Sequence, residues 1–291
     1  MTGWKKIFYS LAVAVLFIGQ AHFSYSGQHN YTLPKFYLDD YFEYPTEFQK
    51  NLNTAWNICQ NIKFSNELPD LLKLPREGFD CSRLIDWVHE KAMYIVSVYA
   101  YNSRVYDKET QRLFPLGYQP GFNEYGINVG VLLQDTVTLN KMDLVFTMIF
   151  QRDVFKMNAS EYHPIVALEK RTFSPLGSSE VEAIVFLSTL AHEAFHGTGY
   201  VHGPCTPNER ARECDLDSKG PFTVEVLIFE AFVKSCESDP SLLYCEKRNL
   251  DVIKHHIEVS KRSIISSSER VSQHIGNILH ALSWTFGPKR N

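Results

Sequence analysis

Three histidines in the segment Leu187–Cys205 constrain the fold of this chain more than any other feature of its sequence. His192 and His196 are four residues apart, and His202 follows later. Residues four apart share one face of an α-helix, so the first two imidazoles can point at a common atom. The third can reach that atom only if the helix ends after His196 and the chain folds back. The sequence therefore predicts a helix that stops inside this segment.

The residues around the histidine pair suit such a helix end. Ser179 and Glu182 form a capping box, which predicts a helix running from there to about His196. Gly197 and Gly199 can both adopt the left-handed conformation that ends helices, and Gly199 is the better position for the sharp reversal. The helix should therefore carry two imidazoles at its C-terminal end, and the following turn should bring the third one back.

Three imidazoles that converge on one point are a suitable donor set for a catalytic zinc ion. Such an ion has three protein ligands, and its fourth position is left for water. We therefore expect Zn²⁺ as the cofactor and His192, His196 and His202 as its ligands. Glu193 follows the first ligand on the flank of the same helix face. Its carboxylate could accept a proton from an activated water and pass it to a leaving amine.

The eleven residues HEAFHGTGYVH, at positions 192–202, match the pattern H-E-x-x-H-x-x-G-x-x-H at every position. A bare H-E-x-x-H is a modest signal, and the added glycine and histidine make a chance match much rarer. In this stretch the chain resembles the zincin metallopeptidases and, within them, the metzincin clan. The resemblance implies that His192, His196 and His202 bind zinc and that Glu193 is the general base in peptide-bond hydrolysis. It also implies a sheet over the active-site helix.

The resemblance lacks one feature of the metzincins. Those enzymes place a methionine in a turn beneath the metal, after the third histidine, whereas the last methionine here is Met157. Either another side chain lies beneath the metal, or the chain shares only the ligand geometry of the wider zincin group. A second ligand scheme also stays open, in which Glu225 or Glu230 is the third ligand, as in the gluzincins. We expect these glutamates instead to orient a histidine ring or to pair with Arg or Lys.

The N-terminus predicts export. Lys5 and Lys6 precede an apolar run, 7–19, that is followed by small residues, which is typical of a cleavable signal peptide over residues 1–26. The run is shorter than the roughly 20 residues that a membrane-spanning helix needs. We therefore expect a secreted or periplasmic protein with no membrane contact after signal cleavage.

Six cysteines would then meet an oxidising compartment, where an even number favours disulfide bonds. The simplest scheme has two short local loops and one remaining pair, which gives Cys205–Cys214, Cys236–Cys245 and Cys59–Cys81. Other connectivities stay open, because the sequence alone does not select one.

The chain before the motif predicts a mixture of helices and strands. Residues 27–77 form an aromatic, proline-punctuated extension with one helix around residues 47–61, and a catalytic domain spans residues 78–291. Apolar spacing predicts an amphipathic helix over residues 81–99. Short runs of branched and aromatic residues predict three strands, at residues 127–134, 144–150 and 163–173.

The chain after the motif is mainly helical. Pro221 suits the first turn of a helix whose residues 222–236 are apolar nearly all round, and residues 250–284 predict two more helices. We therefore expect an α+β, zincin-like fold, with a mixed sheet packed on a long active-site helix and a mainly helical C-terminal part. The segment Asp215–Gly220 begins like a calcium loop, but Lys219 stands where an oxygen ligand is needed, so we reject a calcium site.

The expected function is hydrolysis of a protein or peptide substrate. Tyr200, Tyr244 and His163 are candidate donors of a hydrogen bond to the oxyanion of the reaction intermediate.

A formal net charge of −4 gives no indication of a nucleic-acid partner. An exported zinc-binding structural or binding domain without turnover is the alternative, and a metal-assisted hydrolase of another bond also stays open. The sequence does not indicate the oligomeric state.

Overall fold

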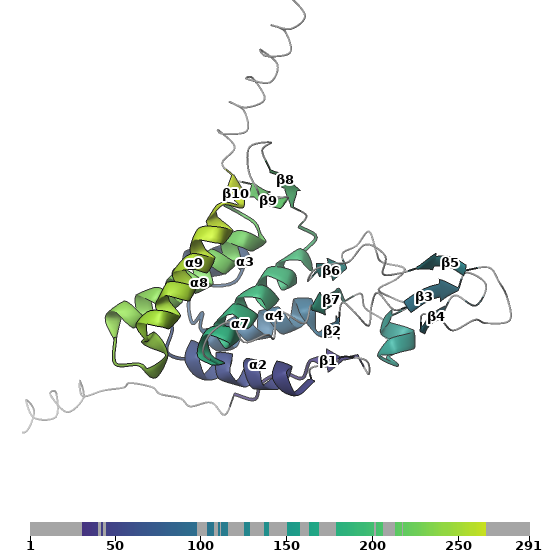
Figure 1. Cartoon of the computed structure of the whole chain (residues 1–291), viewed down its shortest axis with the longest axis horizontal. Coiled ribbons are helices and arrows are strands. Elements are labelled where there is room, and N and C mark those ends of the chain that lie inside the picture. Colours follow the sequence, from purple (N-terminus) through teal and green to yellow (C-terminus); the bar gives the residue numbers. More distant parts are fainter. Residues whose placement is uncertain are drawn as a thin grey trace, which may run out of the picture. The chain divides into compact units, whose positions relative to one another are not determined.

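The computed structural model describes much of the chain between residues 31 and 265 (Figure 1). The described residues are 31–39, 42, 45–97, 104–107, 110, 112–115, 125–128, 137–139, 150–157, 163–168, 179–200, 202–205, 213–216 and 218–265. Residues 33–291 form one compact unit, separate from residues 1–32. The predicted signal peptide, residues 1–26, lies outside the described residues. Among the helices that are described, none has the length and apolar character that crossing a membrane requires.

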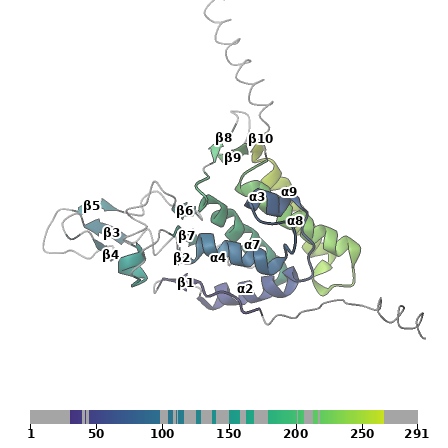
Figure 2. The ribbon, with the colours of Figure 1, turned by 180° about the vertical axis from the view of Figure 1, so that it is seen from behind.

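Helices make up the larger part of the described structure, and helix α7 lies among α2, α4 and α8 (Figures 1 and 2). The described α-helices are α2 (Pro45–Cys59), α3 (Glu67–Leu72), α4 (Cys81–Ala92), α7 (Ser179–His196), α8 (Pro221–Ser238) and α9 (Lys247–Lys261). The predicted limits of α7 and the predicted start of α8 at Pro221 are confirmed. Of the two helices predicted over residues 250–284, α9 covers the start. The prediction is wrong at Ile264–Ile265, which form strand β10, and residues 266–284 lie outside the description.

The helix predicted over residues 81–99 is wrong in its last third. Helix α4 begins at Cys81, where Asp80 accepts a hydrogen bond from the backbone N–H of Arg83 at 3.0 Å, but it ends at Ala92. Strand β2 (Tyr94–Ser97) follows at once. Ile95 and Val96 continue the apolar helical spacing of α4, and a short apolar run does not distinguish a helix end from a buried strand.

A four-stranded mixed sheet has the strand order β1-β2-β7-β6. Its strands are β1 (Tyr37–Leu38), β2, β7 (Ile165–Leu168) and β6 (Val137–Leu139). Strand β2 runs parallel to both β1 and β7, with Ile95 opposite Val166, while β6 is antiparallel to β7. Every residue of β7 is buried, as expected for a parallel strand with both faces covered. The expectation of a mixed α and β architecture is confirmed.

The other strands form two small three-stranded sheets. One contains β3 (Arg104–Asp107), β4 (Arg112–Pro115) and β5 (Tyr125–Asn128), and the other contains β8 (Gly203–Pro204), β9 (Glu213–Leu216) and β10 (Ile264–Ile265). The strand predicted over residues 163–173 contains β7, and residues 169–173 lie outside the description. Of the strand predicted over residues 127–134, residues 127–128 end β5, and the rest also lies outside the description. In the run 144–150 only Phe150 is described, and it begins a short π-helix, Phe150–Val154, rather than a strand.

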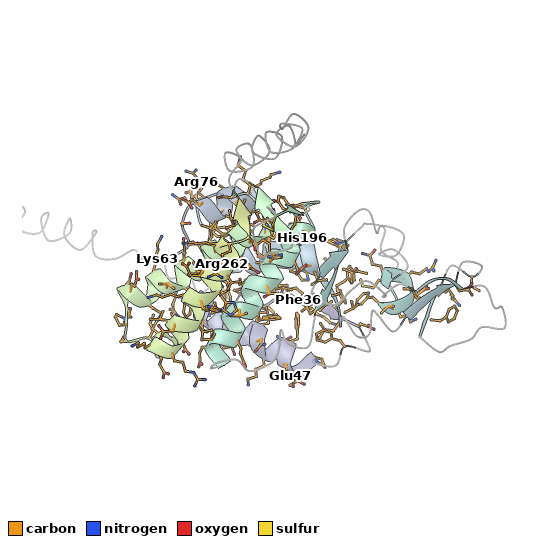
Figure 3. All side chains as sticks on the ribbon, turned by 45° about the horizontal axis from the view of Figure 1, so that its top comes forward. Phe36, Glu47, Lys63, Arg76, His196 and Arg262 are labelled. Carbon is orange, nitrogen blue, oxygen red and sulfur yellow. A yellow bond between two sulfur atoms is a disulfide. The ribbon has the colours of Figure 1, made fainter. Side chains whose placement is uncertain are left out.

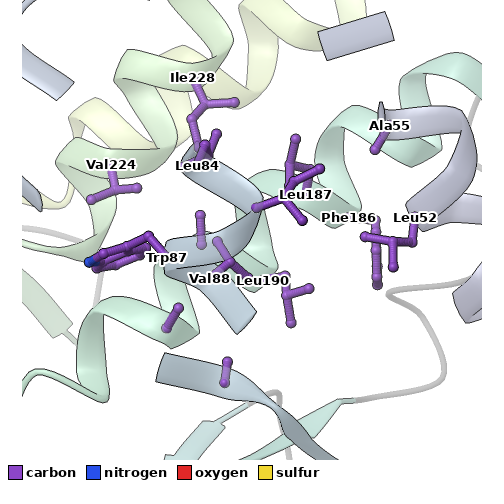
Figure 4. Packing of buried hydrophobic residues seen from close by; sticks show 14 of the residues in the cluster. Leu52, Ala55, Leu84, Trp87, Val88, Phe186, Leu187, Leu190, Val224 and Ile228 are labelled. Atoms are coloured by element: carbon purple, nitrogen blue, oxygen red, sulfur yellow. The ribbon is translucent and has the colours of Figure 1, made fainter. Parts of the chain in front are cut away.

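The main core lies where four helices meet (Figure 4). Leu52 of α2, Leu84 of α4, Leu187 of α7 and Ile228 of α8 are all fully buried in one cluster. Helix α2 belongs to the predicted extension, so this part of the extension packs directly against the motif helix. The domain boundary at residue 77 stays a prediction.

All six cysteines are paired, in the simplest scheme that their spacing suggested. The three disulfides are Cys59–Cys81, Cys205–Cys214 and Cys236–Cys245. Three disulfides in one chain are compatible with an oxidising compartment. Export itself stays a prediction.

Candidate metal centre

Helix α7 ends at His196, which is labelled in Figure 3, and a turn with two glycines follows. Gly197 lies in a tight space, because an added Cβ would be 2.7 Å from the carbonyl oxygen of Lys91 and 2.8 Å from the Pro164 ring. Gly199 has a φ angle of +91°, which L side chains rarely adopt. The predicted reversal at Gly199 is confirmed, and it returns the chain so that His202 faces the two histidines of α7.

The three imidazole rings approach one another through their Nε2 atoms. Nε2 of His192 lies 3.3 Å from Nε2 of His196 and 3.3 Å from Nε2 of His202. One ring nitrogen from each of the three residues lies within 4.8 Å of the others. A metal ion with nitrogen ligands at about 2.1 Å in tetrahedral arrangement separates neighbouring ligand atoms by about 3.4 Å. The triad could therefore hold a metal ion.

The opposite nitrogen of each ring lies near an oxygen atom. Nδ1 of His196 lies 2.9 Å from the backbone oxygen of Tyr200, and Nδ1 of His202 lies 3.0 Å from Oδ1 of Asp215. Nδ1 of His192 lies 3.1 Å from Oε1 of Glu225, although its N–H is not well aligned on that oxygen. A neutral ring that donates through Nδ1 has a lone pair on Nε2. Three inward lone pairs cannot hydrogen-bond to one another, whereas a cation accepts all three.

Asp215 connects the third histidine to the start of α8. Its side chain is fully buried, and its second oxygen accepts a hydrogen bond from the backbone N–H of Thr223 at 3.0 Å. That N–H belongs to the first turn of α8, where helix donors lack partners within the helix. Gly220 leaves room for this carboxylate, because an added Cβ there would lie 2.2 Å from Cγ of Asp215.

The two candidate glutamates of α8, Glu225 and Glu230, differ in their partners. Glu225 faces Nδ1 of His192 with one oxygen, and its other oxygen accepts a hydrogen bond from Oγ of Ser260 at 2.7 Å. Glu230 pairs with Lys261 at 2.9 Å. Both contacts agree with the expectation from the sequence that these glutamates orient a histidine ring or pair with Arg or Lys. Among the described residues, His202 rather than a glutamate completes the group of potential ligands.

Phe222, on the first turn of α8, packs against two rings of the triad. Its ring centroid lies 4.7 Å from that of His202 in a stacked arrangement and 4.8 Å from that of His192 edge to face. An aromatic ring thus supports the histidines on one side. No methionine follows His202 in the sequence, and Phe222 is the side chain that makes this supporting contact.

The electrostatic surroundings of the triad suit a cation. Burial, together with repulsion from a protonated His192, lowers the pKa of His196 to about 3, so this ring is neutral at physiological pH. Burial also acts to lower the pKa of His192, but the negative charges of Glu225, Glu193 and Asp215 raise it overall. The carboxylates that attract a proton to His192 would equally attract a metal ion to the Nε2 atoms.

Glu193 lies in the last full turn of α7, next to the first histidine, and only 4% of its surface is exposed. Of the three candidate oxyanion donors, Tyr200 lies nearest the triad, with its ring centroid 6.1 Å from that of His202. Tyr244 packs on Phe232 in a separate hydrophobic cluster, and His163 packs on Tyr94 beside the sheet.

The sequence identified the three histidines, but it did not identify the residues that orient them. Asp215 and Phe222 were missed, and Asp215 was considered only as part of a calcium loop. One feature of the sequence could have indicated that Asp215 lies near His202. Asp215 directly follows Cys214, whose disulfide partner Cys205 lies three residues after His202. Strands β8 and β9 pair antiparallel here, with Gly203 opposite Cys214, so the disulfide and the strand pair bring Asp215 to the third histidine.

We compared the chain with models of protein families, with curated protein sequences and with solved structures, and none of the three comparisons gave a match.

Proposed function

We propose that this protein is a zinc-dependent metallopeptidase of the zincin type, in which His192, His196 and His202 hold the ion and Glu193 is the general base. One observation carries the proposal. Nε2 of His192 lies 3.3 Å from Nε2 of each of the other two histidines, and the opposite Nδ1 of each ring lies near an oxygen. The sequence motif gives Glu193 its place beside this centre.

The proposed reaction divides the work between the ion and the protein. A bound Zn²⁺ would supply Lewis acidity and lower the pKa of a coordinated water toward about 7. Glu193 would take the proton of the attacking water and deliver it to the leaving amine. Tyr200 is the nearest candidate to donate a hydrogen bond to the oxyanion.

The test is the variant Glu193→Gln, which keeps the shape of the side chain and removes its basicity. We expect it to bind one zinc ion per chain, as the parent does, and to hydrolyse an unfolded protein substrate at least about 100-fold more slowly. Glu182→Gln is the matched control, because Glu182 lies near the opposite end of α7 and loses the same charge. It should retain the parental rate.

Three outcomes of this experiment would count against the proposal in different ways. Equal rates for Glu193→Gln and the parent would remove the general-base assignment. Zinc at one per chain without hydrolysis of any unfolded protein substrate would support an exported zinc-binding structural domain instead. Absence of zinc in the parent would remove the metal centre altogether.

A further inference from the structure

A pocket of about 580 Å³ lies between α3 and the turn that follows α7. Pockets that bind small molecules commonly have volumes of roughly 300–1,000 Å³. None of the three histidines is among the residues that line it, so it is distinct from the candidate metal centre. Apart from Tyr200, none of its lining residues has a role in the proposed hydrolysis.

The inner wall of this pocket is apolar. Leu71 and Leu72 of α3 face Phe195 and Tyr200 across it. Leu72 and Phe195 are almost fully buried, and the ring of Phe195 packs edge to face on that of Tyr200, with centroids 5.6 Å apart. A ligand that enters this space would bury an apolar group of its own against these side chains.

The rim of the pocket carries an excess of available positive charge. Lys73, at the end of α3, and Lys219, just before α8, are both exposed, and neither forms an ion pair with any described residue. Asp70 at the rim is already held by Arg76 through two contacts of 2.6 Å. Among the described residues that line the pocket, Glu67 is then the one remaining carboxylate against two ammonium groups. The rim therefore favours an anion.

We propose that this pocket binds an amphipathic carboxylate, with its bulky apolar part against Leu71, Phe195 and Tyr200 and its carboxylate at Lys73 and Lys219. Two classes of molecule have this chemistry: a peptide C-terminus with a large apolar last residue, and a medium-chain fatty acid. A single ammonium group at a solvated rim contributes little, whereas two that share one carboxylate act together.

The pocket borders the residues that orient the histidines. Tyr200 lines it with its side chain and accepts the Nδ1–H of His196 with its backbone oxygen. Lys219 precedes Gly220, which lies against the carboxylate of Asp215. A ligand here would contact both segments that hold the outer partners of the triad. The binding itself requires no turnover, so it can succeed or fail independently of the proposed peptidase activity.

Isothermal titration calorimetry on the full chain tests the proposal with three probes. These are N-acetyl-leucyl-phenylalanine, the same dipeptide with a C-terminal amide, and decanoate. We expect the free acid to bind about 5–10-fold more tightly than the amide, because only the acid interacts with both lysines. This ratio should shrink as the salt concentration rises, since the rim is solvated. Binding of decanoate would extend the site to fatty acids, whereas its failure beside a bound acid would restrict it to peptide termini.

Variants separate the two halves of the site. The double variant Lys73→Gln with Lys219→Gln should bind the acid and the amide equally, whereas Leu71→Ala should weaken both by the same factor. Lys63→Gln with Lys234→Gln removes the same charge from exposed positions outside the pocket and should keep the parental ratio. Equal binding of acid and amide by the parent would overturn the proposal. So would an unchanged ratio in the Lys73 and Lys219 variant, or no binding of any probe at millimolar concentration.

Discussion

Nδ1 of His202 lies 3.0 Å from Oδ1 of Asp215, and the other oxygen of the same carboxylate accepts the backbone N–H of Thr223. One fully buried carboxylate therefore serves two donors, the third histidine of the triad and the first turn of α8. The orientation of His202, a proposed zinc ligand, therefore depends on the position of helix α8.

Asp215→Asn should weaken zinc binding by about 10–100-fold, because a carboxylate that orients a ligand histidine contributes this much to affinity. An amide has only one acceptor oxygen, so either His202 or Thr223 would lose its contact with this side chain. Competition with a chromogenic chelator measures the affinity. Asp251→Asn, at an exposed position on α9, serves as the control. An Asp215→Asn protein with the affinity of the parent would show that this carboxylate does not position the histidine.

Gly220→Ala should destabilise the fold by about 1–3 kcal/mol, because its Cβ would overlap the Asp215 carboxylate and force it to move. The zinc affinity should also fall, because the displaced carboxylate is the one that contacts His202. Gly199→Ala is a useful comparison, since its Cβ would meet no neighbouring atom and its cost comes from the backbone angle alone, about 1 kcal/mol. Chemical denaturation and chelator competition measure both quantities. A Gly220→Ala protein that keeps full zinc affinity would contradict the proposed packing around Asp215.

The two short disulfides offer a matched pair of variants. Cys205–Cys214 and Cys236–Cys245 both join cysteines nine positions apart. Loss of either should cost a similar free energy of unfolding, about 2–3 kcal/mol by chain entropy. Replacing both cysteines of a pair by alanine should weaken zinc binding only for Cys205–Cys214, which links the segment of His202 to that of Asp215. Equal zinc affinity in the two double variants would argue that this disulfide has no role at the centre.

Phe222→Ala should loosen the rings of His192 and His202 and weaken zinc binding, because the side chain packs on both. Phe222→Met should bind zinc more tightly than Phe222→Ala, since a thioether also packs well on an aromatic ring. Zinc affinities of the three proteins, measured at one pH, test this order. If the alanine variant matches the parent, the packing of Phe222 is not needed at the site.

Local features of the chain could be predicted from the sequence, and contacts between distant segments could not. The end of α7 was predictable because the helical spacing and the turn at Gly199 are encoded within a few residues. Strand β2 was missed because Tyr94–Ser97 extends the apolar pattern of α4, and only its pairing with β7 distinguishes it from helix.

The orienting residues of the site depend on tertiary structure in the same way. Asp215 reaches His202 only through the pairing of β8 with β9, and Phe222 reaches the triad only because α8 packs on α7. Glu225 and Glu230 were recognised as carboxylates that need partners, since both lie in an apolar helix. Which of them faces a histidine follows from the packing of α8 against α7 and α9, so the sequence left both possible.

The central claim is that three imidazoles bind one ion. X-ray absorption at the zinc edge, on the full chain loaded with one equivalent of zinc, tests it most directly. The account predicts three imidazole nitrogens at about 2.0–2.1 Å and one further light atom, with no sulfur. A spectrum that requires two imidazoles or fewer, or a thiolate sulfur at about 2.3 Å, would contradict it.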